Sequence, residues 1–343
     1  MRVCSWASLS VLMALIAVLA LRIIGARSWP IELFNHFVFQ YLLGAILLSL
    51  AFAVMRRKGL AALALMLAVA FAVDHRQTPH HREDNSMLRG GTASASVADD
   101  SKKRWHSLSL ITSNLYVLNR RQDDVLAWLA TRPAEVVVLQ ELPNAIRTGL
   151  EKLREVYPYQ FIVEPGTPLN SGVYMGRESM GIVSVHPIVA TEAPGASIWR
   201  KLALKARLSI SGAVNPWIVA VHPSYPVNRA RLSARDVYLS EIAAVVANLE
   251  GPVVVAGDFN TTPYAPVFRD FLDASGTSTF QDFPATWPAA LGPLGIPIDH
   301  ILVRGARLID LTALASIGSD HRGLKAKILL PPLINKLGAA ASR

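Results

Sequence analysis

Residues 253–260, VVVAGDFN, decide how we interpret the rest of this chain. The segment opens with four consecutive apolar residues, which is typical of a strand buried on both faces. Gly257, Asp258 and Asn260 follow at once. Asp and Asn often form tight turns, so the pair alone has an ordinary structural explanation. At the end of a buried strand, however, polar side chains lie where α/β proteins bind their ligands.

The same arrangement recurs along the chain, where strand-like runs adjoin residues that bind metals or transfer protons. Each of these residues also has a simpler explanation: Glu141 is compatible with a surface or helix-capping acid, and a lone His222 with a hydrogen-bonded structural histidine. Because all of them lie beside segments that are predicted to form strands, one common site is favoured. The positions are Asn114, Gln140-Glu141, His222, Asp299-His300 and Asp320-His321.

Between these positions, strand and helix patterns alternate from residue 105 onward. About 240 residues of this kind form one domain with a sizeable core rather than two. The pattern predicts strands over 108–115, 136–139, 159–163, 181–185, 202–210, 217–221, 253–256, 298–303, 308–314 and 324–329, and helices over 123–130, 145–156 and 229–249.

Three apolar runs precede this domain, at residues 3–21, 33–55 and 59–73. The first two, at roughly 19 and 23 residues, are long enough to cross a bilayer as helices. The third has roughly 15 residues, or about 22 Å, and spans only if the basic residues 56–58 extend it and snorkel. A cleaved signal peptide is disfavoured, because a second apolar run follows almost at once. We expect two or three transmembrane helices within residues 1–73.

Composition changes abruptly after residue 73. Residues 74–104 contain almost no large apolar side chains and are interpreted as an exposed linker. Its paired histidines, His80 and His81, are a metal-binding possibility, but a solvated linker explains them more simply. The α/β domain is predicted over 105–332 and a C-terminal tail over 333–343.

The overall composition narrows the class of protein. Of 343 residues, 52% are hydrophobic and 17% charged, and the mean hydropathy of +0.33 is too high for an ordinary soluble enzyme or a disordered chain. A single cysteine, Cys4, excludes an internal disulfide and a thiolate zinc site. The net charge is +9, of which about +6 falls after residue 100. That charge suits a phosphate-bearing substrate or an anionic membrane surface, although basic proteins are common.

These residues resemble the endonuclease/exonuclease/phosphatase superfamily, which includes deoxyribonuclease-I-like nucleases, inositol-polyphosphate phosphatases and sphingomyelinases. The resemblance covers roughly residues 108–330, and the membrane-anchored bacterial type is the one suggested. It implies an α/β four-layer sandwich of two mixed β-sheets flanked by helices. The motifs that carry it are Gln140-Glu141, Gly257-Asp258-Phe259-Asn260, Ile298-Asp299-His300 and Ser319-Asp320-His321, with Asn114 and His222 as acceptable matches.

The resemblance also implies roles for these residues. Glu141 is the principal ligand of Mg²⁺ or Mn²⁺, with Asn114 and Asp320 completing or orienting its shell. Asp258 and Asn260 hold the attacking water and the phosphoryl oxygens, and Asn114 also contacts phosphate.

His321 is a general base or a phosphate contact oriented by Asp299, and His222 donates to a non-bridging oxygen. His300 follows Asp299 on a strand, so its side chain should face away from the site. Tyr225, Arg229 and Arg235 are the candidates for further family residues that the motifs do not place.

The leading interpretation is a membrane-anchored, divalent-metal-dependent phosphoesterase that uses in-line attack of water on a phosphodiester or phosphomonoester. A DNA or RNA nuclease is the alternative enzyme, although a net charge of about +6 after residue 100 is low for a domain that binds nucleic acid. A catalytically inactive, membrane-tethered binding module is the alternative of a different class. The expected partners are a phosphate-ester substrate (nucleic acid, phospholipid headgroup or small phosphoester) and the lipid bilayer, and we infer no obligate protein partner.

The basic cluster at residues 56–58 predicts the orientation of the apolar segments. The positive-inside rule places this cluster in the cytoplasm. If residues 59–73 span, the catalytic domain lies outside; if they only lie in the interface, it faces the cytoplasm. We expect a multi-pass protein of the inner (plasma) membrane with an extracytoplasmic catalytic domain.

Overall fold

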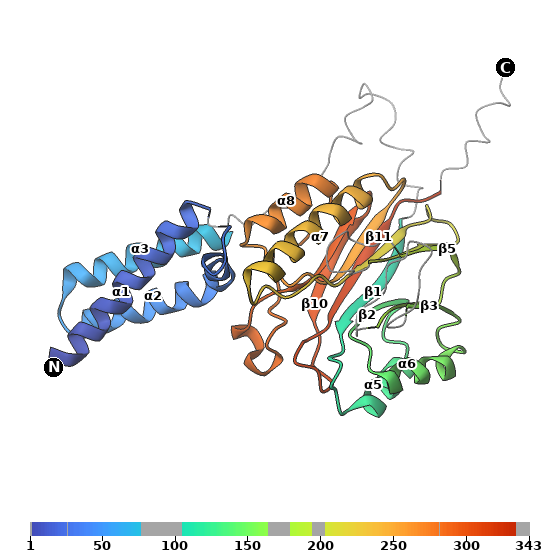
Figure 1. Ribbon diagram of the computed structural model, residues 1–343, viewed down its shortest axis with the longest axis horizontal. Coiled ribbons are helices and arrows are strands. Elements are labelled where there is room, and N and C mark those ends of the chain that lie inside the picture. The colour runs from blue at the N-terminus through green and yellow to red at the C-terminus, as the bar shows by residue number, and fades with distance from the viewer. Residues whose placement is uncertain are drawn as a thin grey trace, which may run out of the picture.

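The computed structural model describes residues 2–25, 27–76, 105–163, 179–193, 203–280 and 282–333. Figure 1 shows two parts: three long helices at the N-terminus, and a region of two β-sheets with helices on its outside. Most of the predicted linker, residues 77–104, and all but the first residue of the predicted tail lie outside the described residues.

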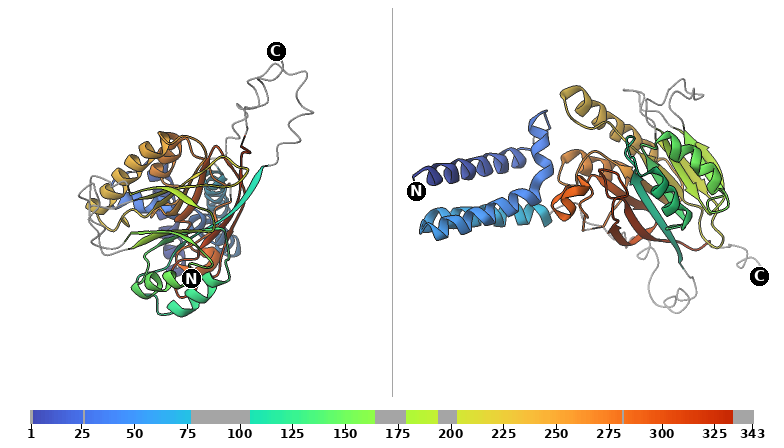
Figure 2. Two further views of the ribbon diagram at one scale, coloured as in Figure 1. Left: turned by 90° about the vertical axis from the view of Figure 1, so that its right-hand side faces the viewer. Right: turned by 90° about the horizontal axis from the view of Figure 1, so that it is seen from below.

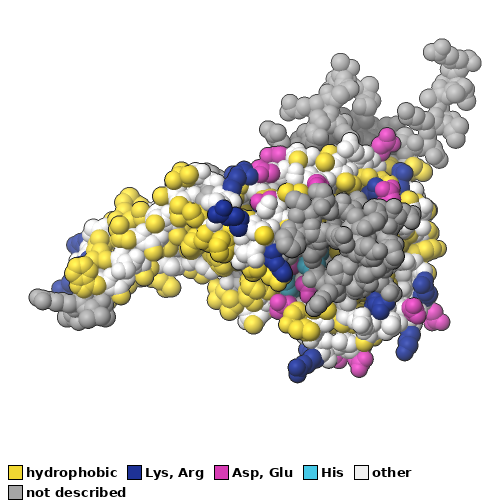
Figure 3. All heavy atoms as spheres, viewed as in Figure 1, with side chains coloured by type: hydrophobic (Ala, Val, Ile, Leu, Met, Phe, Trp, Pro, Cys, Tyr) yellow, Lys and Arg dark blue, Asp and Glu magenta, His cyan; other side chains and the backbone are white. Residues whose placement is uncertain are grey.

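The N-terminal part consists of α1 (Arg2–Ile23), the short helix η1 (Ile31–Phe37), α2 (Val38–Val54) and α3 (Lys58–Arg76). Three helical segments here, 6–23, 31–54 and 58–76, are long and apolar enough to cross a membrane. Hydrophobic side chains cover much of the visible face of this part in Figure 3.

The third helix is longer than the apolar run in the sequence. It has 19 residues, or about 28 Å, because Lys58 begins it and Asp74, His75 and Arg76 extend it. Asp74 is accommodated by a salt bridge of 2.7 Å to Arg22, near the end of α1. The expected length deficit is therefore almost removed.

The two sheets are mixed, as predicted. One has six strands in the order β10-β11-β1-β2-β4-β3, and the other has five in the order β5-β6-β7-β8-β9. Among the strands that the structure describes, only β1–β2 and β7–β8 are parallel neighbours. The strands are β1 (His106–Asn114), β2 (Val136–Gln140), β3 (Tyr159–Val163), β4 (Met180–Ser184), β5 (Ile188–Glu192), β6 (Leu204–Leu208), β7 (Trp217–Val221), β8 (Val253–Asp258), β9 (Asp299–Arg304), β10 (Arg307–Ala313) and β11 (Leu324–Leu330).

Helices cover the outer face of each sheet. α5 (Gln122–Ala130) and α6 (Asn144–Leu150, continued by η3, Glu151–Leu153) pack on the six-stranded sheet, and α7 (Arg229–Ala247) and α8 (Pro266–Ser275) pack on the five-stranded one. Alternation along β2 explains the layers: Val136 and Val138 pack between the sheets, whereas Val137 and Leu139 face α5 and α6. The predicted four-layer sandwich is confirmed (Figures 1 and 2).

Several hydrogen bonds and ion pairs join the N-terminal helices to the sandwich, and those described all reach residues 235–295. Arg235 of α7 pairs with Glu32 at 2.8 Å, and the His36 Nδ1 lies 3.0 Å from the Thr262 Oγ1. The remaining contacts join Arg27 to Asp270, Gln40 to the carbonyls of Leu294 and Gly295, and His75 to Tyr264. The two parts therefore form a connected unit.

Candidate active site

The six-stranded sheet contributes Asn114 and Glu141 to one edge. Asn114 ends β1 and is paired in register with Gln140, the last residue of β2, so Glu141 emerges beside it. The Asn114 Nδ2 donates a 3.0 Å hydrogen bond to Glu141 Oε1, while its Oδ1 accepts from the backbone N–H of Tyr116. Glu141 has a φ of 50°, an uncommon conformation for a residue with a side chain, which is often found at functional sites.

The five-stranded sheet supplies His222 and Asp258 from the carboxyl ends of its parallel strands β7 and β8. Gly257 precedes Asp258 and lies opposite Val221. A Cβ on Gly257 would lie 2.0 Å from the Val221 carbonyl oxygen, and its φ is 153°. The glycine of the GDFN motif is therefore needed because the neighbouring backbone approaches so closely.

Asp258 joins the contributions of the two sheets. Its Oδ1 accepts the backbone N–H of Asn260 at 2.8 Å, and its Oδ2 accepts the Asn114 Nδ2 at 3.2 Å. His222 Nε2 lies 3.7 Å from Asp258 Oδ2 and 3.5 Å from Glu141 Oε1. Asn260 has a φ of 49°, and its Nδ2 donates to the Pro223 carbonyl at 3.1 Å. One carboxylate thus contacts groups from both halves of the sandwich.

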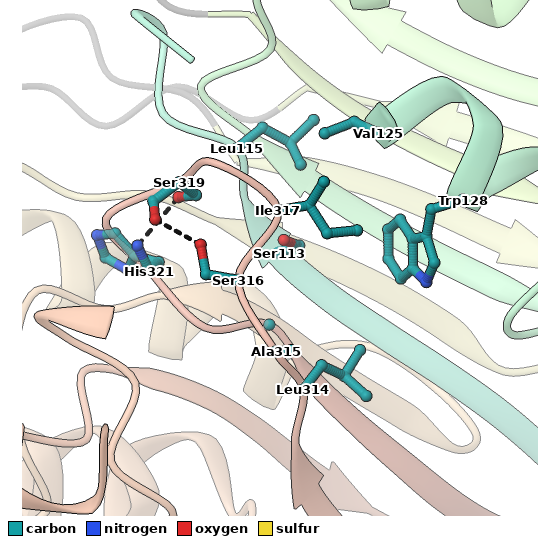
Figure 4. Close-up of a pocket in the computed structure, with 11 residues that line it drawn as sticks. Ser113, Leu115, Val125, Trp128, Leu314, Ala315, Ser316, Ile317, Ser319 and His321 are labelled. Carbon is teal, nitrogen blue, oxygen red and sulfur yellow. Dashed lines mark hydrogen bonds between the residues drawn. The ribbon is translucent and has the colours of Figure 1, made fainter. Parts of the chain in front are cut away.

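The loop before β11 carries His321 into the same site. Ser319 Oγ accepts the backbone N–H of His321 and donates to the Asn114 carbonyl at 2.7 Å, so this serine holds the loop on the end of β1. Figure 4 shows Ser319 joined by dashed lines to His321 and Ser316, at one side of a small pocket that Ile317 and Trp128 also line. The His321 Nδ1 lies 2.9 Å from Asp299 Oδ2, and its Nε2 lies 3.7 Å from Asp258 Oδ2.

Burial and charge shape the protonation of this cluster. Burial raises the pKa of the Asp258 carboxyl, although the nearby histidines oppose the shift. Burial by itself would lower the pKa of the His321 imidazole, but the carboxylates of Asp299 and Asp258 outweigh it and raise that pKa to about 10. The protein without metal therefore holds a protonated His321, which suits a phosphate contact better than a general base.

The residues present fit a divalent metal with oxygen ligands. Ligand atoms of Asp258, Asp299 and His321 lie within 4.8 Å of one another. Among the described residues, the buried Asp299 Oδ1 has no hydrogen-bond partner. The Glu141 carboxylate is 19% exposed beside this cluster and is accessible from solvent. Carboxylates near an open position are the ligands that Mg²⁺ and Mn²⁺ prefer.

Two predicted metal ligands are placed differently from Glu141. Asp320 is exposed, and its Oδ2 accepts a hydrogen bond of 3.1 Å from the Trp287 Nε1. Asn114 presents its N–H groups, not its oxygen, to the carboxylates of Glu141 and Asp258. In this arrangement Asn114 orients the carboxylates, and ligation through its oxygen requires the amide to turn over. Their assignment as ligands stays a prediction.

The remaining candidates lie outside the cluster. His300 packs among Phe259, Phe268 and Phe283 and lies 2.9 Å from the Thr261 carbonyl, and burial lowers its pKa to about 4. Its position away from the site agrees with the strand alternation. Tyr225 and Arg229 are exposed.

Sequence reasoning gave no role to three supporting residues. Thr286 Oγ1 accepts the backbone N–H of Asp299, and the Tyr238 hydroxyl accepts that of His222. Arg235 is fully buried, and its NH1 donates to the Asn260 carbonyl at 3.2 Å. Only Arg235 stood among the candidates, and its burial on α7 is seen only in the structure.

Comparison with known proteins shows which families, sequences and folds this chain resembles. The model of the endonuclease/exonuclease/phosphatase family matches residues 111–321. A UPF0294 protein from Vibrio cholerae is 25% identical over 236 residues, covering 65% of this chain and 78% of the relative. The crystal structure of an endonuclease/exonuclease/phosphatase from Beutenbergia cavernae aligns with a TM-score of 0.53 at 17% identity, over 66% of this chain and 72% of that one. The crystal structure of D. rerio TDP2 complexed with single-strand DNA product aligns with a TM-score of 0.52 at 18% identity. The alignment covers 65% of this chain and 98% of that one.

Proposed function

Because this chain belongs to the endonuclease/exonuclease/phosphatase family, whose members are generally hydrolases of phosphoester bonds that use divalent metals, we propose that it is a membrane-anchored, divalent-metal-dependent phosphoesterase. One observation carries the proposal: Asp258 lies against Asn114 from the six-stranded sheet and against His222 and His321 at the same edge. A binding module without catalysis would not need a buried carboxylate between two histidines, whose desolvation is costly.

The side chains suit hydrolysis by attack of water in line with the leaving group. A divalent cation held by Glu141, with Asp320 or Asn114 nearby, would neutralise charge on the phosphoryl oxygens. Asp258 and Asn260 would orient the attacking water, and the raised pKa of Asp258 suits it to accept a proton. Protonated His321, held by Asp299, and His222 would donate hydrogen bonds to oxygens that gain charge in the transition state.

The experiment uses the full chain in detergent micelles with a panel of plasmid DNA, abasic duplex DNA, sphingomyelin and phosphoinositides. We expect hydrolysis of one class in Mg²⁺ or Mn²⁺, and its loss in EDTA with recovery when the metal is restored. Asp258→Asn, which keeps the size of the side chain, is the matched inactive control. Hydrolysis of no class in either metal, or equal turnover by Asp258→Asn, would overturn the proposal.

The arrangement of the helices also supports an extracytoplasmic catalytic domain. The turn at residues 55–57 and the N-terminus lie at one end of the three helices, and the sandwich contacts the other end (Figure 1). With the basic cluster in the cytoplasm, three spanning helices put the sandwich outside the inner membrane. Trypsin added to intact spheroplasts should then cleave within residues 77–104. Cleavage only after lysis would place the domain in the cytoplasm.

A further inference from the structure

A second group of metal-ligating side chains lies at the opposite end of the six-stranded sheet. His106 begins β1, Glu135 directly precedes β2, and His186 follows β4, which pairs antiparallel with β2. His106 is eight residues from Asn114 on β1, a separation of roughly 26 Å in an extended strand. This group, which we name the distal triad, is therefore separate from the candidate active site.

The distal triad gathers two nitrogen ligands and one oxygen ligand. Ligand atoms of His106, Glu135 and His186 lie within 4.8 Å of one another. The His186 Nε2 lies 3.2 Å from Glu135 Oε1, and the two imidazole rings stand nearly perpendicular, with centroids 6.3 Å apart. Among the described residues, the buried His106 Nε2 has no hydrogen-bond partner. An unsatisfied buried ring nitrogen is costly unless a ligand completes it.

Glu135 is held in the way that metal-ligating carboxylates are held. Its Oε2 accepts two hydrogen bonds from Ser109, at 2.7 Å from the backbone N–H and 2.8 Å from the hydroxyl. Its Oε1 faces His186, so one oxygen is fixed while the other remains available for a ligand. The side chains of His186 and Glu135 are 19% and 34% exposed, which leaves an entry path for an ion.

We propose that the distal triad binds a transition-metal ion of the zinc class, with a water or a further ligand in the fourth position. Two imidazoles and one carboxylate form the His₂Glu set that Zn²⁺ takes in open, three-ligand protein sites. Mg²⁺ prefers oxygen ligands and would not compete for the two ring nitrogens. The ion would fasten the start of β1, where the chain enters the sandwich, to the neighbouring ends of β2 and β4.

Zn²⁺ titration tests this proposal on the full chain in detergent, with excess Mg²⁺ present to occupy the catalytic site. The double variant His80→Ala/His81→Ala serves as the background protein, because these two consecutive histidines of the predicted linker are another source of zinc binding. We expect one Zn²⁺ per chain by equilibrium dialysis, and a zinc-dependent rise in Tm, because a ligand that binds only the folded state stabilises it. His186→Ala and Glu135→Gln should each weaken binding by about 100-fold, and Ser109→Ala by about 10-fold.

The control for folding is the Mg²⁺-dependent hydrolysis proposed above or, if that proposal fails, the far-ultraviolet circular dichroism of each variant. Visible absorption of bound Co²⁺ gives a second readout, because its intensity reports low-coordinate nitrogen and oxygen ligation. The proposal is overturned if the background protein binds no Zn²⁺. It is equally overturned if folded His106→Ala/His186→Ala binds Zn²⁺ as tightly as the background.

Discussion

The five-stranded and six-stranded sheets each bring a parallel strand pair to the candidate site, but their attachments to the rest of the molecule differ. The described hydrogen bonds and ion pairs from the N-terminal helices reach only residues 235–295, which belong to the five-stranded half. The six-stranded half reaches the site through Asn114, Glu141 and the His321 loop. One half of the site is therefore fixed directly to the N-terminal helices, whereas the other half is joined to them only through the rest of the sandwich in the part of the chain that the structure describes.

The largest effect should follow from breaking the attachment itself. Glu32→Leu leaves the fully buried Arg235 without its partner from the helices, although Asp236 still pairs with it. Removing one partner of a buried ion pair costs about 3–5 kcal/mol, and we expect the lower end of this range. Chemical unfolding of the full chain in detergent measures the loss. Glu32→Leu/Arg235→Met should recover most of it, and an undiminished stability of Glu32→Leu would show that the attachment is not energetically important.

One carboxylate from each half tests whether both halves are needed for catalysis. Asp258→Ala and Glu141→Ala should each lower phosphoester hydrolysis by about 10²-fold or more, because each removes an electrostatic or positioning group. Turnover at saturating Mg²⁺, with folding checked by circular dichroism, gives the comparison. A folded Glu141→Ala with full activity would restrict the chemistry to the five-stranded half.

The close approach of β7 and β8 can be tested with two glycines that both have a positive φ, 153° at Gly257 and 77° at Gly212. Gly257→Ala places a Cβ against the Val221 carbonyl, whereas a Cβ on Gly212, at φ 77°, has nothing within 4 Å. Both variants are strained by a positive φ, so the larger loss at Gly257→Ala would report the clash together with the more extreme φ of 153°. We expect Gly257→Ala to lose about 2 kcal/mol more than Gly212→Ala in urea unfolding. Equal losses would mean that the strands separate at little cost.

The pair formed by Asp299 of β9 and His321 crosses between the halves, and its members should act as one unit. The double variant Asp299→Ala/His321→Ala should be within about threefold of the worse single variant, because losses at coupled catalytic residues are not additive. Steady-state kinetics of the three variants measure this. If the loss of activity in the double variant equalled the product of the losses in the two single variants, the two residues would act independently.

The smallest expected effect concerns the His321 imidazole, which should not titrate near neutral pH. Because the pKa of His321 is raised to about 10, its imidazole should stay protonated from pH 6 to 8 in chelated protein, as seen by NMR of labelled histidine. The stabilisation that comes with this shift is complete below the unfolded pKa of about 6.5 and declines as the pH rises to about 10. Asp299→Asn should bring the titration toward neutral pH. A wild-type midpoint near 6.5 would contradict the strong coupling.

The sequence allowed the central strands and the polar positions at their ends to be predicted, because buried apolar runs such as residues 253–256 leave few alternatives. Strand β5 was missed because its residues are half-exposed or exposed and lack an apolar run, and α8 was not predicted either. The spacing of Phe268, Phe271 and Leu272 was the helical signal for α8. Side-chain direction was beyond the sequence: the turn of Asp320 toward Trp287 and the reach of Arg235 to Glu32 depend on segments far apart in the chain.

The attachment of Thr262 and Arg235 to the helix end around Glu32 and His36 has a kinetic consequence. If the N-terminal helices span a bilayer, as we propose, these contacts would hold the candidate active site at a fixed distance from the membrane surface. For a substrate that shares the bilayer, encounter is then a two-dimensional search, and the rate follows the mole fraction of that substrate in the surface. Diluting it with inert lipid would slow the enzyme even at constant bulk concentration, whereas a water-soluble phosphoester would show no such dependence.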